Sequence, residues 1–261
     1  MSEKRNIALV QFENVSYSVP SVRSPIIDKL NLSLEQGEVL VLLGESGCGK
    51  TTTLKLVNRL LMPSSGNVRV NGKTTLDWDP IRLRRETGYV IQEGGLFPHF
   101  TVAQNISLIP RLEGWNASRT DQRVQELLQL VGLDADKFAT RYPNELSGGQ
   151  RQRVGVARAL GGEPPLLLMD EPFGALDPLT RADLQREFAA LAKRLQKTVL
   201  FVTHDVREAL MLGNRIGLMQ HGKLLTLQTP AEFVRSTEPQ IRSYLDTLGL
   251  PQSLESTGGV S

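Results

Sequence analysis

Cysteine is nearly absent from this sequence, whose 261 residues include only Cys48. A lone cysteine forms no disulfide within its own chain, which excludes the disulfide-stabilised scaffolds of small secreted proteins. A charge excess of one sign is absent as well, because 30 Lys and Arg face 28 Asp and Glu, for a formal net charge of +2. A net charge so close to zero gives no electrostatic argument for nucleic acid, which we exclude as a main partner.

Long hydrophobic runs are also missing. The longest are Val39–Leu43, Leu166–Met169 and Val199–Val202, far short of the roughly 20 apolar residues that span a bilayer. The apolar run near the start stops at Gln11, too early for the core of a signal peptide. We therefore expect a cytoplasmic protein that, if it works at a membrane, relies on another subunit for the membrane span.

The sequence does contain the patterns of a globular α/β protein. Hydrophobic residues make up 40% of the chain, enough to bury a substantial core. A helix is predicted from Lys50 to about Leu61, ended by Pro63, and the stretch from Phe97 to Leu160 is mostly helical in pattern. A hairpin is predicted around Asn67–Val70 and Asn71-Gly72. Strands are predicted at Ile7–Val19, Ile26–Leu34, Glu38–Leu43, Tyr89–Gln92, Leu166–Met169, Val199–Val202, Ile216–Met219 and Leu224–Leu227.

A glycine-rich segment joins the strand Glu38–Leu43 to the first helix. Its sequence GESGCGKT matches the phosphate-binding pattern G-x-x-x-x-G-K-[ST] in full. Glycines let successive backbone N–H groups curl around a phosphate, and the opening helix adds free N–H groups and the positive end of its dipole. Lys50 would reach the β- and γ-phosphates, and the Thr51 hydroxyl would ligate Mg²⁺. The residues predicted here to bind nucleotide are Gly44, Glu45, Ser46, Gly47, Cys48, Gly49, Lys50, Thr51 and Thr52.

Two acids follow the apolar strand Leu166–Met169. A continuous apolar run is typical of a strand buried on both faces of a parallel sheet, and ligands bind at the carboxyl edge of such sheets. Asp170 would hold Mg²⁺ directly or through water, and Glu171 would polarise the attacking water as general base. Paired acids also occur as solvated strand ends, so this prediction depends on the phosphate loop upstream.

A second phosphate-binding turn is predicted in LSGGQ, which begins at Leu146. Its serine is a favourable N-cap for the helix that follows, and its glycines expose backbone N–H groups at the start of that helix. The alternative is a turn that only caps a helix. Since one phosphate loop is already present, a second phosphate-binding turn would be surplus unless two chains share a nucleotide. The residues concerned are Ser147, Gly148, Gly149 and Gln150.

In this order, the phosphate loop, LSGGQ and LLLMDEP resemble the signature of the ATP-binding cassette family, and the resemblance covers roughly Ile7 to Leu248. Four shorter elements fit the family order. Gln92 resembles the Q-loop glutamine, Ala175-Leu176-Asp177 resembles the D-loop, His204 resembles the switch histidine, and Tyr17 resembles the aromatic residue that stacks on adenine.

The resemblance implies roles for these residues. Thr51, Gln92 and Asp170 would surround Mg²⁺, while Glu171 and His204 would be catalytic. Plainer alternatives remain for the shorter elements. Tyr17 also fits an ordinary strand aromatic, His204 a structural histidine, and Asp177 a cap for the helix that begins at Pro178.

The resemblance also implies an architecture and partners. The fold would be a P-loop NTPase core, α/β with a parallel sheet, an antiparallel β subdomain near the N-terminus and a helical subdomain inserted at about residues 97–160. One domain would cover residues 1–248, followed by a polar tail at 249–261. Two copies would close head to tail around ATP and Mg²⁺. Integral-membrane permease subunits would hold the chain at the cytoplasmic face of the inner membrane, and an extracytoplasmic solute-binding protein would act indirectly.

Two segments point to a subfamily. GYVIQEGGLFPHFTVAQNISLIPRLEGW, from Gly88 to Trp115, and VNRLLMPSSG, from Val57 to Gly66, resemble importers of glycine betaine, choline, carnitine and related quaternary amines. The transported solute does not touch such an ATPase, so the substrate rests on analogy. An importer ATPase for another small solute, such as an amino acid, is the alternative, ahead of a soluble cassette ATPase without a transport role.

The coupling surface is expected beside Gln92. In the family, a short permease helix docks next to the Q-loop, and Glu93–Phe100 with the Arg82–Arg85 cluster would form that groove. The alternatives are packing within the chain for the apolar loop and a solvated helix face for the arginines.

Cys48 lies inside the phosphate loop, near Lys50 and a helix N-terminus. This environment is expected to lower the pKa of the thiol, so that alkylation blocks ATP binding and ATP protects. An inert small residue is the alternative.

Overall fold

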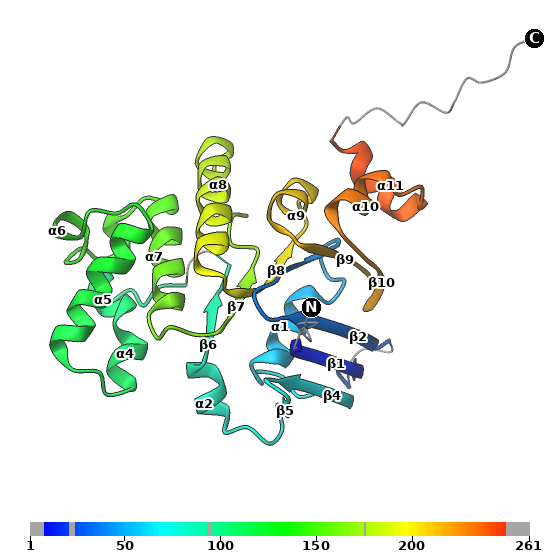
Figure 1. Cartoon of the computed structure of the whole chain (residues 1–261), viewed down its shortest axis with the longest axis horizontal. Helices are drawn as coiled ribbons and strands as arrows, with labels where there is room; N and C mark the ends of the chain where they lie inside the picture. Colours follow the sequence, from blue (N-terminus) through cyan, green and yellow to red (C-terminus); the bar gives the residue numbers. More distant parts are fainter. Residues whose placement is uncertain (1–7, 21–23, 93–94, 175, 249–261) are drawn as a thin grey trace, which may run out of the picture.

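The computed structural model describes residues 8–20, 24–92, 95–174 and 176–248. Its described strands form an antiparallel sheet and a second, mainly parallel sheet (Figure 1). The first, in the order β2-β1-β4-β5, contains β1 (Ala8–Tyr17), β2 (Ile27–Glu35), β4 (Ser65–Val70) and β5 (Lys73–Thr74). The second, in the order β10-β9-β3-β8-β7-β6, contains β3 (Val39–Leu43), β6 (Thr87–Val90), β7 (Leu166–Asp170), β8 (Thr198–Thr203), β9 (Arg215–Gln220) and β10 (Lys223–Gln228).

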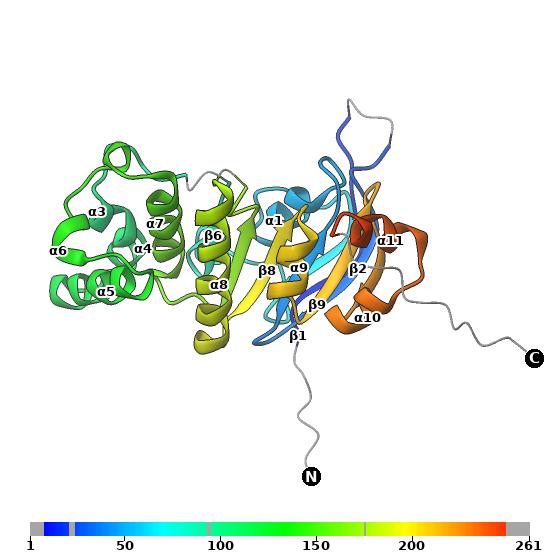
Figure 2. The ribbon, with the colours of Figure 1, turned by 90° about the horizontal axis from the view of Figure 1, so that it is seen from above.

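Helices flank these sheets and extend the body to one side, where α4 to α7 gather in Figure 1 and α3 lies with them in Figure 2. In the described part of the chain, no helix is both long and apolar enough to cross a membrane. The helices are α1 (Lys50–Val57), α2 (Pro80–Arg85), α3 (Val102–Ile106), α4 (Leu108–Leu112), α5 (Ala117–Leu130), α6 (Ala135–Phe138), the 3₁₀ helix η1 (Pro143–Glu145), α7 (Gly148–Leu160), α8 (Pro178–Leu195), α9 (Val206–Leu212), α10 (Pro230–Arg235) and α11 (Pro239–Asp246).

The central strands of the parallel sheet carry the predicted site. β3, β7 and β8 are buried at every position, as their apolar runs predict for a parallel sheet covered on both faces. Leu43 pairs with Thr203, and Asp170 pairs with Val202. The carboxyl ends of the three strands therefore meet at one edge, and the phosphate loop, the paired acids and His204 follow there.

The two faces of this sheet enter separate cores. Leu40, Leu168 and Leu200 face α1 and the antiparallel sheet. Val41 and Phe201 face the opposite way, into the core that α8 and α9 cover. Because α1 contacts β4 on one side and both β7 and β8 on the other, it is held between the two sheets, with its first turn at the site edge.

Most predicted strands are confirmed, as is the hairpin, where Asn71 and Gly72 have φ of 52° and 74°, the left-handed pair of a tight hairpin turn. The predicted end of the first helix is wrong. α1 ends at Val57 because Arg59 has φ of 53°, and the N–H groups of Leu60 and Leu61 both donate to the Lys55 carbonyl. β6 is likewise displaced from the predicted Tyr89–Gln92 to Thr87–Val90.

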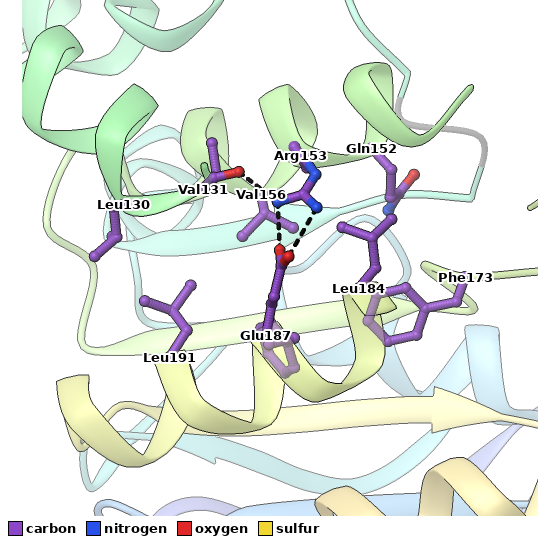
Figure 3. Close-up of a pocket in the computed structure, with 10 residues that line it drawn as sticks. Leu130, Val131, Gln152, Arg153, Val156, Phe173, Leu184, Glu187 and Leu191 are labelled. Atoms are coloured by element: carbon purple, nitrogen blue, oxygen red, sulfur yellow. Dashed lines mark hydrogen bonds and ion pairs between the residues drawn. The ribbon is translucent and has the colours of Figure 1, made fainter. Parts of the chain in front are cut away.

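A small pocket lies where α5 and α7 of the helical segment meet α8 of the core (Figure 3). Arg153 of α7 donates to the Val131 carbonyl at 2.7 Å and pairs with both carboxylate oxygens of Glu187 on α8. Apolar side chains, including Phe173 and Leu184, line the small pocket beneath this ion pair. The Arg153–Glu187 ion pair therefore links α7 to α8 beside a small pocket lined mainly by apolar side chains.

Candidate nucleotide-binding site

The phosphate loop has the backbone geometry that its glycines allow. Gly47 and Gly49 have φ of 82° and 108°, values that favour glycine. A Cβ on Gly49 would lie 2.9 Å from the Ile26 carbonyl oxygen, and one on Gly44 would lie 2.4 Å from the Met219 carbonyl oxygen. The loop is thus packed tightly against neighbouring backbone, and α1 begins immediately after it at Lys50.

Lys50 is the buried cation of the site, only 4% exposed. Its ammonium donates to the carbonyl oxygens of Gly44 at 2.7 Å and Glu45 at 2.9 Å. It also lies 3.8 Å from the Glu171 carboxylate. A buried ammonium at the mouth of a loop of N–H groups is arranged to bind a polyphosphate.

Thr51 and Asp170 form the predicted metal-binding pair. The Thr51 hydroxyl donates to Asp170 Oδ1 at 2.8 Å, and the Tyr89 hydroxyl donates to Oδ2 at 3.2 Å. Burial raises the pKa of Asp170, and the two hydrogen bonds oppose that effect. A hydroxyl beside a carboxylate is a donor set that suits Mg²⁺, a hard cation that prefers oxygen. These residues fit the predicted ion.

Glu171 and His204 lie together next to this pair. Glu171 has φ of 44°, a left-handed conformation that is uncommon outside glycine and often marks a functional site. Its N–H donates to the Val202 carbonyl at 3.0 Å. His204 Nδ1 lies 3.0 Å from Glu171 Oε2, and its side chain is 58% exposed. One carboxylate therefore faces the buried ammonium of Lys50 on one side and an open imidazole on the other.

A cleft of about 400 Å³ opens over the loop. Gln92 and Glu171 lie in its wall, so the predicted Q-loop glutamine reaches the site. Tyr17 is half-buried against the core rather than in the wall, but its carbonyl accepts from the N–H of Ile26, a lining residue. The lining residues are Ile26, Ser46, Gly47, Gly49, Lys50, Thr51, Thr52, Gln92 and Glu171.

The LSGGQ turn lies outside the wall of this cleft. Ser147 is the N-cap of α7, as predicted: its hydroxyl accepts from the Gln150 N–H at 3.2 Å, and its own N–H donates to the Gln150 side chain at 2.9 Å. Ser147 is exposed. The turn is therefore held at the surface by its own capping hydrogen bonds.

The D-loop residue Asp177 caps α8, accepting from the Thr180 N–H at 3.1 Å. That hydrogen bond lowers the pKa of Asp177. Capping, one of the two roles considered for this residue, is confirmed. Its neighbour Ala175 lies outside the described residues.

For Cys48, the expected lowering of the thiol pKa is wrong. Burial raises the pKa of this thiol and outweighs the opposite effect of Lys50. The side chain is 7% exposed and packs in the core beside α1. The sequence shows that Cys48 lies close to Lys50, but it does not show that the thiol is buried.

The residues of the expected coupling surface differ in burial and in contacts. Leu96 is half-buried and packs against the core, while Phe97 and Phe100 are 47% and 37% exposed with ring centroids 5.4 Å apart. Arg82 and Arg85 both pair with Glu113 across the gap between α2 and α4. Glu93 and Gly94 lie outside the described residues. Within the described part of this expected surface, the exposed large apolar side chains are those of Phe97 and Phe100.

Sequence reasoning missed several contacts that hold the site. Tyr89 was predicted only as part of a strand, yet it binds Asp170. The guanidinium of Arg181 donates to the carbonyls of Gly174 and Leu176, beside the predicted D-loop. The alternation of β6 could have placed Tyr89 on the α1 face; nothing in the sequence marks Arg181.

Comparisons with known proteins agree with this geometry. A model of the family described as ABC transporter matches residues 27–174. The chain is 53% identical over 208 residues to the osmoprotectant import ATP-binding protein OsmV of Salmonella typhimurium, covering 80% of this chain and 54% of that protein. It is 49% identical over 228 residues to the choline transport ATP-binding protein OpuBA of Bacillus subtilis, covering 87% and 59%. The chain thus spans little more than half of these relatives.

A third relative is the glycine betaine uptake system ATP-binding protein YehX of Escherichia coli, 46% identical with 85% of this chain and 71% of that protein covered. Among solved structures, a dimeric post-hydrolysis state of the ATP-binding cassette MJ0796 with ADP and Pi superposes with a TM-score of 0.76 at 31% identity, covering 85% of this chain and 98% of that one. The cbiO1 protein of Clostridium perfringens gives 0.80 at 25% identity, covering 93% and 97%. With a family match over more than half its length and relatives at this level of identity, the chain belongs to the ABC transporter family.

Proposed function

We propose that this chain binds and hydrolyses ATP to power a bacterial ABC importer. The observation that carries the proposal is the position of Glu171, whose carboxylate lies 3.8 Å from the Lys50 ammonium and 3.0 Å from His204 Nδ1. A carboxylate between a phosphate-binding lysine and an imidazole is placed to act on a γ-phosphoryl group and its attacking water.

Binding is assigned to the phosphate loop. The N–H groups of residues 44–52 would surround the phosphates, and Lys50 would exchange its bonds with the Gly44 and Glu45 carbonyls for bonds to the β- and γ-phosphates. Tyr17, next to the lining residue Ile26, would stack on adenine. Thr51, Asp170 and Gln92 would hold Mg²⁺, which when bound neutralises charge on the phosphates.

Hydrolysis is assigned to Glu171 and His204. Glu171 would accept a proton from water as that water attacks the γ-phosphorus in line with the leaving oxygen. His204 would orient the water and the transferring phosphoryl, since its exposed ring can turn toward both. The bond between the γ-phosphorus and the leaving oxygen breaks, which gives ADP and inorganic phosphate. The proton taken from water is then on the Glu171 carboxyl.

The complete site requires a second copy. Ser147, Gly148, Gly149 and Gln150 would close over the nucleotide held by the partner's phosphate loop, and Asp177 would lie near the junction. The dimeric arrangement of the MJ0796 cassette supports this reading. Nucleotide would then join the copies, and hydrolysis would release them, which gives the two states that a transport cycle needs.

The proposed cargo is a quaternary amine such as glycine betaine, choline or carnitine. The names of the three relatives support this class. The runner-up is another small solute, such as an amino acid.

Within that importer, residues 1–248 would form one ABC ATPase domain with a helical subdomain at about residues 97–160; the tail predicted at 249–261 lies outside the described residues. Permease subunits would dock on the surface of Phe97 and Phe100 and so keep the chain at the cytoplasmic face of the membrane. A solute-binding protein outside the membrane would deliver the cargo to them.

Two measurements test the proposal. Purified chain should release phosphate from ATP in the presence of Mg²⁺, and Glu171→Gln should abolish this release. Coexpression with the permease and solute-binding subunits of a quaternary-amine importer should give uptake of radiolabelled choline or glycine betaine that Glu171→Gln abolishes. Phosphate release without uptake of either compound would favour the runner-up cargo, whereas failure to release phosphate under any condition would contradict the proposal.

A further inference from the structure

A buried carboxyl group lies behind the catalytic pair. Glu208 of α9 is 4% exposed, and burial raises the pKa of its carboxyl. Its two carboxyl oxygens accept hydrogen bonds from neutral groups: the Gln185 amide donates to one at 2.8 Å, and the Thr203 hydroxyl donates to the other. Burying a carboxyl on neutral donors costs free energy, and here the two hydrogen bonds that satisfy it join α8 to the end of β8.

Thr203 connects this carboxyl to the turn that carries His204. Its hydroxyl donates to Glu208 and accepts from the Asp205 N–H at 2.9 Å. Asp205 in turn caps α9, accepting from the Arg207 N–H at 2.7 Å. The backbone on both sides of His204 is therefore fixed, while its imidazole stays free to contact Glu171 at 3.0 Å.

The other end of the network is α8. Gln185 holds Glu208, and one helical turn earlier Arg181 donates to the Gly174 carbonyl at 3.1 Å and the Leu176 carbonyl at 2.9 Å. One face of α8 is thus connected to two loops. Arg181 contacts the segment that leads into Asp177, and Gln185 is connected through Glu208 and Thr203 to the turn of His204. A displacement of α8 would move both.

We propose that Glu208, supported by Gln185 and acting through Thr203, is the positioning residue that sets His204 against Glu171 and ties this pair to α8. The inference rests on the proposed function for its kinetic consequence, but the position of the His204 ring can be measured without nucleotide. It assigns Gln185, Thr203 and Glu208 a role in hydrolysis although none of them touches the reacting atoms.

The test uses matched variants of the whole chain. Thr203→Val keeps the shape of the side chain and removes the hydroxyl, Thr203→Ser keeps the hydroxyl, and Gln185→Met breaks the network at its α8 end. Steady-state ATPase kinetics and histidine NMR are measured on each. The sequence has 3 histidines, so the His204 signal is assigned by its loss in His204→Ala.

Thr203→Val should lower kcat about tenfold with the KM for ATP changed less than about twofold, as expected for losing one buried hydrogen-bond connection that acts after binding. Thr203→Ser should restore both. The His204 signal should shift in nucleotide-free Thr203→Val and Gln185→Met, while those of His99 and His221 stay in place.

An unmoved His204 signal in folded Thr203→Val and Gln185→Met overturns the inference whatever their activity. Equal losses in Thr203→Val and Thr203→Ser also overturn it, because the hydroxyl would then be irrelevant. A wild-type chain without ATPase activity would contradict the proposed function instead, and the NMR comparison would still decide this inference.

Discussion

The Thr51 hydroxyl donates a 2.8 Å hydrogen bond to Asp170, although 119 residues separate the two in the sequence. The contact exists because β3 and β7 flank β8 in the same direction, which brings their carboxyl ends to one edge of the sheet. The hydrogen bond holds together the two side chains that are proposed to bind Mg²⁺.

Asp170→Asn should therefore weaken the binding of ATP in the presence of Mg²⁺ and leave its binding without Mg²⁺ unchanged. We expect the gain in ATP affinity on adding Mg²⁺ to fall about tenfold or more, since one charged ligand is lost. Calorimetric titration of ATP with and without Mg²⁺ measures this gain. Asp134→Asn, at an exposed helix cap, is the control. An unchanged Mg²⁺ effect in Asp170→Asn would remove this residue from the metal site.

Glu171→Gln should separate binding from hydrolysis. The amide keeps the size of the side chain but cannot accept the proton of water, so kcat should fall about 10²- to 10⁴-fold with ATP still bound. The variant should accumulate as an ATP-bound dimer in size-exclusion chromatography, while Glu126→Gln on the exposed face of α5 behaves as wild type. A monomeric variant with full activity would refute the assignment of Glu171.

Cys48 should react slowly. Because burial raises the pKa of its thiol, the thiolate fraction at about pH 7 is below that of a free cysteine and keeps rising above about pH 8.5. Alkylation followed by mass spectrometry should show a slow rate at about pH 7 that climbs steeply toward about pH 9.5, with denatured protein as the fast reference. A fast rate in the folded chain at neutral pH would restore the original expectation of a low pKa.

The docking surface can be tested with one exposed and one half-buried residue. Phe97→Asp should abolish copurification with coexpressed permease subunits and leave the Tm and the affinity for ATP unchanged. Leu96→Asp should also lower the Tm because Leu96 packs on the core. Val234→Asp, an exposed apolar position on α10, is the control. Normal copurification of Phe97→Asp would exclude this surface.

Much of this site was predictable because its residues are close in sequence to elements with strong signals. The phosphate loop, the acids after β7 and the histidine after β8 each follow an apolar run, and parallel strands bring such ends together. The N-caps of Ser147 and Asp177 depend on their immediate neighbours and were predictable for the same reason.

The rest depended on contacts between distant segments. The burial of Cys48 results from packing beside α1, which no local pattern reports. The Arg153–Glu187 pair and the Gln185–Glu208 bond join elements whose relative placement is fixed only by the assembled cores. The early end of α1 reflects a left-handed Arg59, where the sequence offered only Pro63 as a stop.

The central claim is that each nucleotide is bound between two copies, with Lys50 from one and Ser147 from the other. Lys50→Ala and Ser147→Arg chains are each inactive as homodimers on this account, because every site carries one lesion. Mixing them puts both lesions in one site of the mixed dimer and leaves the other site intact.

ATPase activity of the mixture, compared with each parent at the same total concentration, is the direct measurement. The account predicts activity in the mixture that both parents lack. A mixture as inactive as its parents, or a fully active Ser147→Arg homodimer, would contradict a shared site.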